Sequence, residues 1–208
     1  MPATRPAPRV LEGNIVRLVP LEEQHFPALF SAIGRPDVFE GGYGGGAAGL
    51  PSTEAGFIKF ARNYYRPDVA NVYGVWLHDD TMHEPTLVGT STLGDFELDK
   101  ERAHIGWTAY SPSVWGSAVN PESKLLMLGE AFDHGFGRIK LQADADNARS
   151  RAAIAKLGAR FEGVTRRDQR RADGTWRDAA VYSIIVDDWP EVRAGLVARV
   201  AGFAAATS

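Results

Sequence analysis

The stretch from residue 103 to residue 143 changes its hydrophobic period twice, and this change limits the possible folds more than any other feature of the chain. Residues 103–110 alternate between two faces, which is typical of a half-buried strand. Apolar residues then recur on one face of a helix that begins near Asn120, and a short strand follows at 138–143. A helix between two strands of one sheet predicts a crossover connection.

The elements on either side of this crossover are mostly strands. Before it, the sequence predicts a strand, two helices and two further strands; after it, a helix, a two-stranded hairpin and a terminal helix. This order predicts a mixed α/β (α+β) domain with a mostly antiparallel sheet. The predicted ranges are 14–20, 21–33, 52–65, 72–78 and 86–96 before the crossover, and 147–157, 161–170, 176–186 and 190–203 after it.

The length and composition favour a single globular domain. The chain has 208 residues, of which 44% are hydrophobic and 24% charged, so it can bury a core of ordinary size. We expect one domain over residues 1–208, with residues 1–10 flexible. The lack of cysteine excludes disulfides and thiolate-bound zinc, and no metal site is predicted.

Charge and hydropathy argue against nucleic acid and membranes as partners. The formal net charge of −3 lacks the positive excess that nucleic-acid binding needs. One basic run at 166–171 is expected to be a solvated hairpin strand, although it could also contact an anionic partner. No stretch approaches the roughly 18 apolar residues of a membrane helix, and residues 1–10 do not resemble a signal peptide. We therefore expect a cytoplasmic protein.

The segment WGSA, residues 115–118, predicts an anion-binding site ahead of the central helix. Asn120 is suited to cap that helix, Pro121 to its first turn, and Glu122 to the positive end of its dipole. The small residues before them leave backbone N–H groups open, and such helix ends bind phosphate or pyrophosphate. Because most helix N-termini bind only water, this pattern needs support from a second segment.

That support comes from IKLQADADNARSRAAIAKLGARFEG, residues 139–163. This segment contains a strand, a helix that begins at Asn147 with Ser150 three residues later, and a strand entered through Lys-Leu-Gly and Glu-Gly. Together with the loop at 113–118, this order resembles the GNAT superfamily of acyl-CoA-dependent N-acetyltransferases. The likeness is greatest to its Rim-type group, which contains the ribosomal-protein N-terminal acetyltransferases, and it extends over residues 11–192.

The resemblance implies a GNAT fold, in which a mixed, mostly antiparallel sheet of six to seven strands is flanked by helices. It implies acetyl-CoA as the acyl donor, bound at a pyrophosphate loop of the pattern Gln/Arg-x-x-Gly-x-Gly/Ala. The residues expected to bind the donor are Trp107, Thr108, Val114, Trp115, Gly116, Ser117, Ala118, Val119, Asn147 and Ser150.

Three positions depart from the family pattern. Ser113 replaces the leading Gln or Arg of the loop, and Pro121 removes one backbone donor. Ile154 stands where many members have a tyrosine that protonates the departing thiolate, although the Rim-type group commonly lacks it too. Since the loop acts through backbone N–H groups, the loss of one side chain need not abolish binding.

The resemblance also implies direct attack of a neutral amine on the thioester, which needs a base, a donor to the carbonyl oxygen and an acid for the sulfur. His104 is the first candidate base, because histidine titrates near neutral pH; a histidine that merely faces solvent or a neighbour is an equal alternative. Glu97 and Asp95 are the next candidates. Ser150 is a candidate acid that could equally cap its helix, and a backbone N–H within 107–109 would polarise the carbonyl.

Two functions remain open from the sequence. The first is transfer of an acetyl group from acetyl-CoA to a primary amine, either a protein N-terminus or a small molecule. The second is an acyl-CoA-binding sensor or scaffold without catalysis, which Ile154 and the altered loop favour. A homodimer is plausible, as in many relatives. The glycine-rich residues 40–53 are expected to form a mobile loop or, alternatively, a lid over a binding site.

Overall fold

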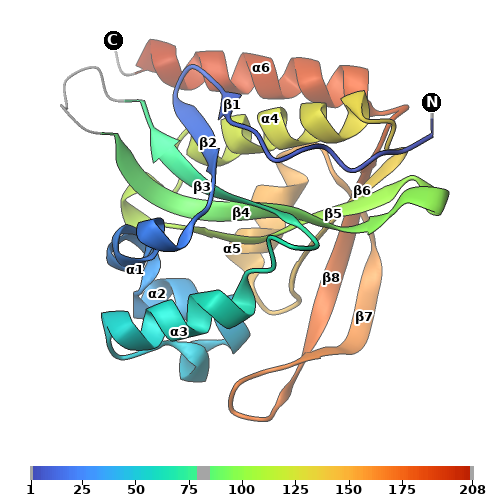
Figure 1. The fold of residues 1–208 in the computed structure, drawn as a ribbon. Helices are drawn as coiled ribbons and strands as arrows, with labels where there is room; N and C mark the ends of the chain where they lie inside the picture. Colours follow the sequence, from blue (N-terminus) through green and yellow to red (C-terminus); the bar gives the residue numbers. More distant parts are fainter. Residues whose placement is uncertain (1, 79–84, 207–208) are drawn as a thin grey trace.

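The computed structural model of the chain describes residues 2–78 and 85–206, which form one sheet flanked by helices (Figure 1). The sheet order is β1-β2-β3-β4-β5-β6-β8-β7, and the neighbouring strands are antiparallel apart from the parallel pair β5 and β6. The predicted α/β class with one parallel crossover is confirmed. The strands are β1 (Leu11–Glu12), β2 (Val16–Pro20), β3 (Asn71–Leu77), β4 (Thr86–Glu97), β5 (Arg102–Tyr110), β6 (Arg138–Asp144), β7 (Arg160–Arg170) and β8 (Trp176–Ile185).

The sheet has eight strands rather than the expected six to seven. The additional strand is β1, which has only two residues and pairs with Arg17 and Leu18 of β2. Two residues are too few for any alternation of polar and apolar side chains, so the hydrophobic pattern contained no sign of this strand.

Helices cover both faces of the sheet (Figure 1). Helices α4 and α6 contact each other on one face, while α1 packs against α3 and against β4 on the other, and α5 packs against β6. No helix of the described residues is long and apolar enough to cross a bilayer. The helices are α1 (Phe26–Ile33), α2 (Pro36–Phe39), α3 (Glu54–Tyr64), α4 (Val119–Asp133), α5 (Ala148–Ala155) and α6 (Trp189–Ala206).

The predicted crossover consists of β5, α4 and β6, and its two strands separate soon after they pair. The register between them ends at His104 and Lys140. Beyond His104, strand β5 has a bulge, in which Trp107 and Thr108 together face Ser91 of β4. Trp107 has a φ of 48°, a left-handed conformation that is rare for a bulky side chain. The bulge and the separation turn this part of β5 toward an opening in the sheet.

Helix α4 begins earlier than predicted, so Asn120 is not its cap. Ala118 occupies the cap position and makes no side-chain cap bond. The Ser117 hydroxyl oxygen instead accepts a hydrogen bond from the N–H of Val119 (3.3 Å). Asn120 therefore lies inside the first turn. Pro121 follows it at the third helical position, where an N–H has no intrahelical acceptor in any α-helix, so the proline costs the helix no hydrogen bond.

Glu122, in the same turn, fixes α4 to the beginning of β2. Its buried carboxylate accepts hydrogen bonds from the N–H groups of Asn14 (2.9 Å), Ile15 (2.7 Å) and Val16 (2.7 Å). Gly13 allows this close approach, because a Cβ there would lie 2.6 Å from Glu122 Cδ. The glutamate thus holds the first turn of α4, and the loop before it, in a fixed position.

Residues 2–10 make specific contacts with the rest of the domain through two arginines. Arg5 donates from Nη2 to the carbonyl oxygen of Ala70 (3.0 Å) and from Nε to Oδ1 of Asn71 (3.2 Å). Arg9 forms an ion pair with the buried carboxylate of Glu130 on α4. The partners of both arginines are distant in sequence, so composition alone could not indicate these contacts.

Candidate functional site

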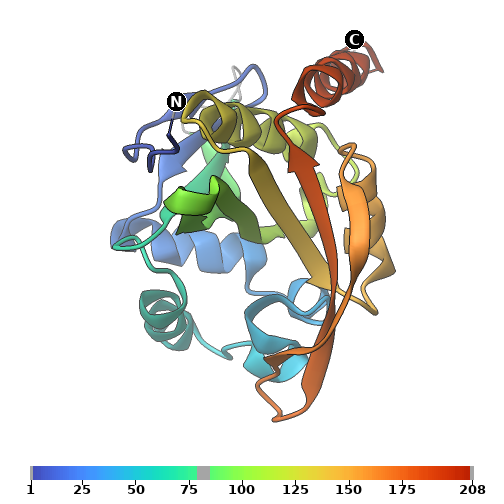
Figure 2. The same cartoon turned by 90° about the vertical axis from the view of Figure 1, so that its right-hand side faces the viewer.

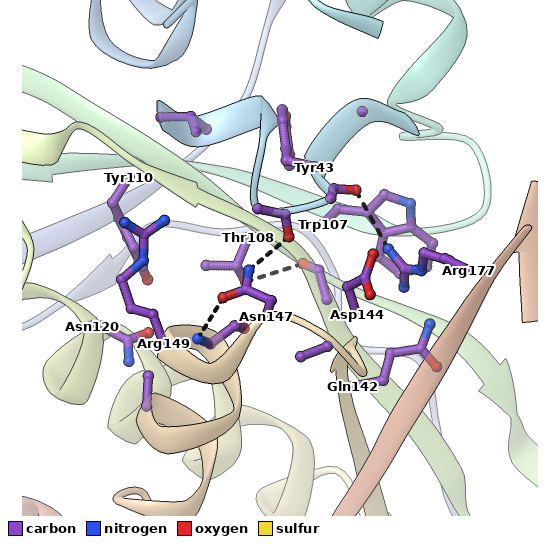
Figure 3. Close-up of a pocket in the computed structure, with 18 of the residues that line it drawn as sticks. Tyr43, Trp107, Thr108, Tyr110, Asn120, Gln142, Asp144, Asn147, Arg149 and Arg177 are labelled. Carbon is purple, nitrogen blue, oxygen red and sulfur yellow. Dashed lines mark hydrogen bonds between the residues drawn. The ribbon is translucent and has the colours of Figure 1, made fainter. Parts of the chain in front are cut away.

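The separation of β5 from β6 opens into a cavity of about 970 Å³ (Figure 3). Its centre is lined by the two strands. We call the part beside the loop before α4 and helix α5 the helix end, and the part beside the β7–β8 hairpin and the glycine-rich segment the hairpin end. The helix end is lined by Val114, Trp115, Gly116, Ser117, Asn120, Pro121, Asn147, Arg149, Ser150, Ala152, Ala153, Lys156 and Arg199. The hairpin end is lined by Val38, Gly41–Gly45, Tyr64, Asp144, Asp168–Ala172 and Arg177.

The loop before α4 presents free backbone N–H groups to the helix end. Gly116 has a φ of 77°, which favours glycine, and a Cβ there would meet nothing within 4 Å. Within the described part of the chain, the N–H groups of Gly116 and Ala118 make no hydrogen bond. Open space over unpaired donors at the start of a helix fits an anionic group such as a pyrophosphate.

Basic side chains add positive charge to the helix end. The Arg149 guanidinium lies over the Trp115 ring, with Cζ 3.5 Å from the ring centroid. Trp115 is itself fixed by a hydrogen bond from Nε1 to the carbonyl oxygen of Tyr110 (3.0 Å). Lys156 and Arg199 line the same end. Three cations around a set of free N–H groups suit a ligand with several phosphates.

His104 and Asp95 form a hydrogen-bonded pair at the centre of the cavity. His104 Nδ1 lies 3.0 Å from Asp95 Oδ2, and Lys140 Nζ lies 3.8 Å from the same oxygen. Because a carboxylate only accepts, the proton of a neutral ring is placed on Nδ1, and Nε2 is left as a proton acceptor. Burial lowers the pKa of His104 below its usual value, although the hydrogen bond to Asp95 opposes this shift. The imidazole is therefore neutral at pH 7 and can take up a proton.

The position of this imidazole depends on its neighbours in β5. Nε2 is buried and has no hydrogen-bond partner among the described residues. A Cβ at Gly106 would lie 2.6 Å from both Cε1 and Nε2 of His104, so only glycine leaves room for the ring. The Trp107 ring packs nearby, with its centroid 5.0 Å from that of His104. The proton-accepting nitrogen thus has a defined orientation and a defined place.

Asn147 caps α5 and also links it to the glycine-rich segment. Its Oδ1 accepts a hydrogen bond from the N–H of Ser150 (2.9 Å), and its Nδ2 donates to the carbonyl oxygen of Gly41 (2.6 Å) (Figure 3). The cap explains why asparagine begins this helix. The second bond joins two segments that are far apart in the sequence, and it brings the cap residue onto the cavity wall.

The glycine-rich residues 40–53 form a wall of the hairpin end. They contain two short 3-10 turns, Tyr43–Gly45 and Ala47–Gly49. The tip of the β7–β8 hairpin lies beside them (Figure 2), and the N–H of Ala172 donates to the carbonyl oxygen of Gly45 (2.9 Å). The Tyr43 and Tyr65 hydroxyls are hydrogen-bonded beneath this wall. Gly41–Gly45 of this segment thus line the hairpin end.

Most of the residues predicted for the site line this cavity, and three do not. Glu97 is exposed, and its carboxylate accepts a hydrogen bond from Lys100 Nζ (2.6 Å). The side chains of Ala118 and Val119 are buried beneath the loop. The predicted residues on the cavity wall are His104, Trp107, Thr108, Val114, Trp115, Gly116, Ser117, Asn147 and Ser150.

The cavity also contains residues that the sequence analysis did not select. The polar residues Lys140, Gln142 and Asp144, at alternate positions of β6, line it together with Ala143 and with Arg177 of β8. Figure 3 shows Gln142, Asp144 and Arg177. Asp144 forms an ion pair with Arg171, whereas Arg177 donates only to the carbonyl oxygen of Gly42 (3.4 Å) among the described residues. The alternation of polar and apolar residues along β6 was the one sequence signal that could have identified Lys140, Gln142 and Asp144.

Three comparisons with known proteins bear on the family of this chain. Residues 16–160 match the family model described as an acetyltransferase (GNAT) domain. A T. thermophilus protein assigned to the acetyltransferases is 30% identical, with a TM-score of 0.81 over 95% of this chain and 100% of that one. A GCN5-related N-acetyltransferase from Brucella melitensis is 25% identical, with a TM-score of 0.82 over 95% and 87% of the two chains. No curated protein sequence matches this chain.

The structure of Mycobacterium smegmatis RimJ in complex with CoA-disulfide is also similar. It is 21% identical, with a TM-score of 0.70 over 94% of this chain and 96% of that one. At this identity the likeness concerns the fold alone.

Proposed function

The chain belongs to the GNAT acetyltransferase family, and from this premise we propose that it transfers an acetyl group from acetyl-CoA to a primary amine by direct attack. Acetyl-CoA is the acyl donor of this family. The Asp95–His104 pair is the observation that carries the proposal, because it places a neutral, buried imidazole in the same cavity as an anion-binding helix start.

In this proposal the helix end holds the donor. The free N–H groups of Gly116 and Ala118 bind the pyrophosphate, and Arg149, Lys156 and Arg199 face the remaining phosphate charge. Ser113 does not line the cavity, so the assignment does not depend on its side chain. Pro121 removes one free N–H from the first turn of α4, and the N–H groups of Gly116 and Ala118 remain for the pyrophosphate.

His104 then acts as the general base. Its Nε2 removes a proton from the acceptor nitrogen as that nitrogen attacks the thioester carbon, and Asp95 stabilises the imidazolium that results. Main-chain N–H groups within 107–109, beside the bulge of β5, stabilise the negative charge on the thioester oxygen. General base catalysis of this kind contributes on the order of 100-fold to 10,000-fold to the rate.

The acceptor is a protein N-terminal amine or a small-molecule amine. The Rim-type assignment rests on the motifs at 113–118 and 147–163 and favours a protein N-terminus. The wall formed by residues 40–53 narrows the hairpin end, where the acceptor would enter. A sensor or scaffold without catalysis would need only the helix end of the cavity. It would give no reason for a neutral imidazole at the centre, so the Asp95–His104 pair favours the enzyme.

The test combines calorimetric titration of the protein with acetyl-CoA and an assay of thiol release over a panel of short peptides and small amines. We expect acetyl-CoA to bind and at least one amine to release thiol. Binding without thiol release over the whole panel would support the sensor instead. Failure to bind acetyl-CoA at millimolar concentration would contradict both functions.

A further inference from the structure

Lys124 is a buried ammonium group to which the reaction described above gives no role. It lies on α4 below the bulge of β5 and is 4% exposed. Its Nζ donates to Ser91 Oγ (2.7 Å) and to Thr108 Oγ1 (2.8 Å). Among the described lysines, Lys100 and Lys140 have carboxylate partners within 4.0 Å, and Lys124 has none.

Such a group is costly to the fold. Burial of an ammonium group without a counter-ion loses hydration free energy, which two neutral hydroxyls restore only in part. An apolar side chain would fill the same helix position without this cost. A lysine at this position therefore suggests that its charge or its proton is used.

The two hydroxyls bound to Lys124 differ in their surroundings. Ser91 is fully buried on β4 and does not line the cavity, whereas Thr108 lines its centre (Figure 3). The two hydroxyl oxygens are 2.8 Å apart. Thr108 is thus the hydroxyl that connects the buried ammonium group to the space where the acyl donor and the amine would meet.

We propose that Thr108 is the acid that protonates the departing thiolate, and that Lys124 is the positioning residue that supplies its proton. This inference rests on the proposed acetyl transfer. It also accounts for Ile154, which has no proton to donate.

The protons and electrons of this step balance. The C–S bond of the tetrahedral intermediate breaks, and its electron pair stays on sulfur. The sulfur takes the hydroxyl proton of Thr108, and the Thr108 oxygen takes a proton from Lys124 Nζ. His104 holds the proton that the amine lost. It releases this proton to solvent while Lys124 regains one, so each turnover of a neutral amine consumes and releases no net proton.

The acidity of Lys124 suits this role. Burial lowers its pKa to about 7, whereas an ordinary thiol has a pKa of about 8.5, so transfer toward a thiolate is favourable. His104 is the titratable neighbour whose pKa responds to the charge of Lys124. Burial raises the pKa of Tyr110 far above neutral, so that group stays uncharged. The other ionisable residues carried by β4, β5 and α4 are Asp95, Glu97, Arg102, His104, Tyr110, Glu122, Glu130 and Asp133.

The test compares Thr108→Val with Ser91→Ala, since each removes one of the two hydroxyls bound to Lys124. We expect Thr108→Val to lower kcat about 100-fold. We expect Ser91→Ala to lower it no more than about threefold, and Thr108→Ser, which keeps the hydroxyl, to retain most of it. The KM for acetyl-CoA should stay within about threefold in all three variants. Equal losses in Thr108→Val and Ser91→Ala would show that Lys124 has a structural role and would overturn the proposal.

The pH profile gives a second readout. Because Lys124 must be protonated to act, kcat of the wild type should fall as the pH rises through about 7. Lys124→Met should remove this alkaline limb and lower kcat about 100-fold. A Lys124→Met profile that keeps the alkaline limb would overturn the proposal.

If the Lys124→Met variant does not fold, the threonine and serine variants, which keep the lysine, decide the question. An inactive wild type over the whole amine panel would overturn the proposed function as well, whereas an active wild type with a normal Thr108→Val variant would overturn this inference alone.

Discussion

The two ends of the cavity are built in different ways. The helix end combines the backbone N–H groups of the loop before α4 with the basic side chains of Arg149, Lys156 and Arg199. The hairpin end joins side chains and carbonyl groups of β6, β8 and residues 40–53, which are distant in the sequence. Backbone N–H groups suit an acyl donor that a whole family shares. Side chains from several elements suit an amine acceptor that is particular to one protein. Substitutions should therefore separate donor binding from catalysis.

The largest effect is expected at the centre, where the two ends meet. His104→Ala should lower kcat about 100-fold to 1,000-fold, because it removes the base, while the dissociation constant for acetyl-CoA stays unchanged. Steady-state kinetics and calorimetry measure the two quantities. His78→Ala is the matched control, since His78 lies outside the cavity and faces Glu12. A similar loss in both variants would exclude a specific role for His104.

The opposite result is expected at the helix end. Gly116→Val should weaken acetyl-CoA binding about tenfold or more, because valine disfavours the left-handed φ of 77° and fills the space above the N–H groups. Gly163→Val is the control, since Gly163 also has a positive φ and open space at Cβ but lies outside the cavity. Calorimetric titration of both variants with acetyl-CoA measures the two affinities. Unchanged affinity in Gly116→Val would show that the loop does not hold the donor.

A smaller loss is expected when His104 is displaced rather than removed. Gly106→Ala should lower kcat about tenfold, since the new methyl group would overlap the imidazole and shift Nε2. The affinity for acetyl-CoA should not change. A variant with normal kcat would mean that the orientation of the ring is unimportant, and this would argue against its role as the base.

The smallest effect is expected at the link between the ends. Asn147→Ala should lower the free energy of unfolding by about 1 kcal/mol through loss of the helix cap. Asn147→Ser should restore the cap, since serine also caps helices, but not the bond to Gly41. Chemical denaturation measures the first effect, and the KM for the acceptor in the serine variant measures the second. Equal stability of the alanine variant and the wild type would contradict the cap assignment.

The helix end could be predicted from the sequence because its signals are local. Glycine before a helix start and an asparagine cap three residues before Ser150 need no knowledge of distant contacts. The error at Asn120 shows the limit even there, since the Ser117 hydroxyl satisfies Val119 and allows the helix to begin earlier. The hairpin end gave almost no signal. The position of Arg177 and the bond from Asn147 to Gly41 depend on strand register and on how far β5 separates from β6, which no local pattern encodes.

The most direct test of the account is the pH dependence of a single turnover, with acetyl-CoA saturating, in the wild type and in His104→Ala. A neutral His104 is the active form, and burial lowers its pKa below the ordinary value of about 6.5. On the acid side, the wild-type rate should therefore fall as the pH drops below about 6.5, and His104→Ala should be at least about 100-fold slower, without this acid limb. A His104→Ala variant that keeps both the rate and the acid limb would contradict the assignment of His104 as the base.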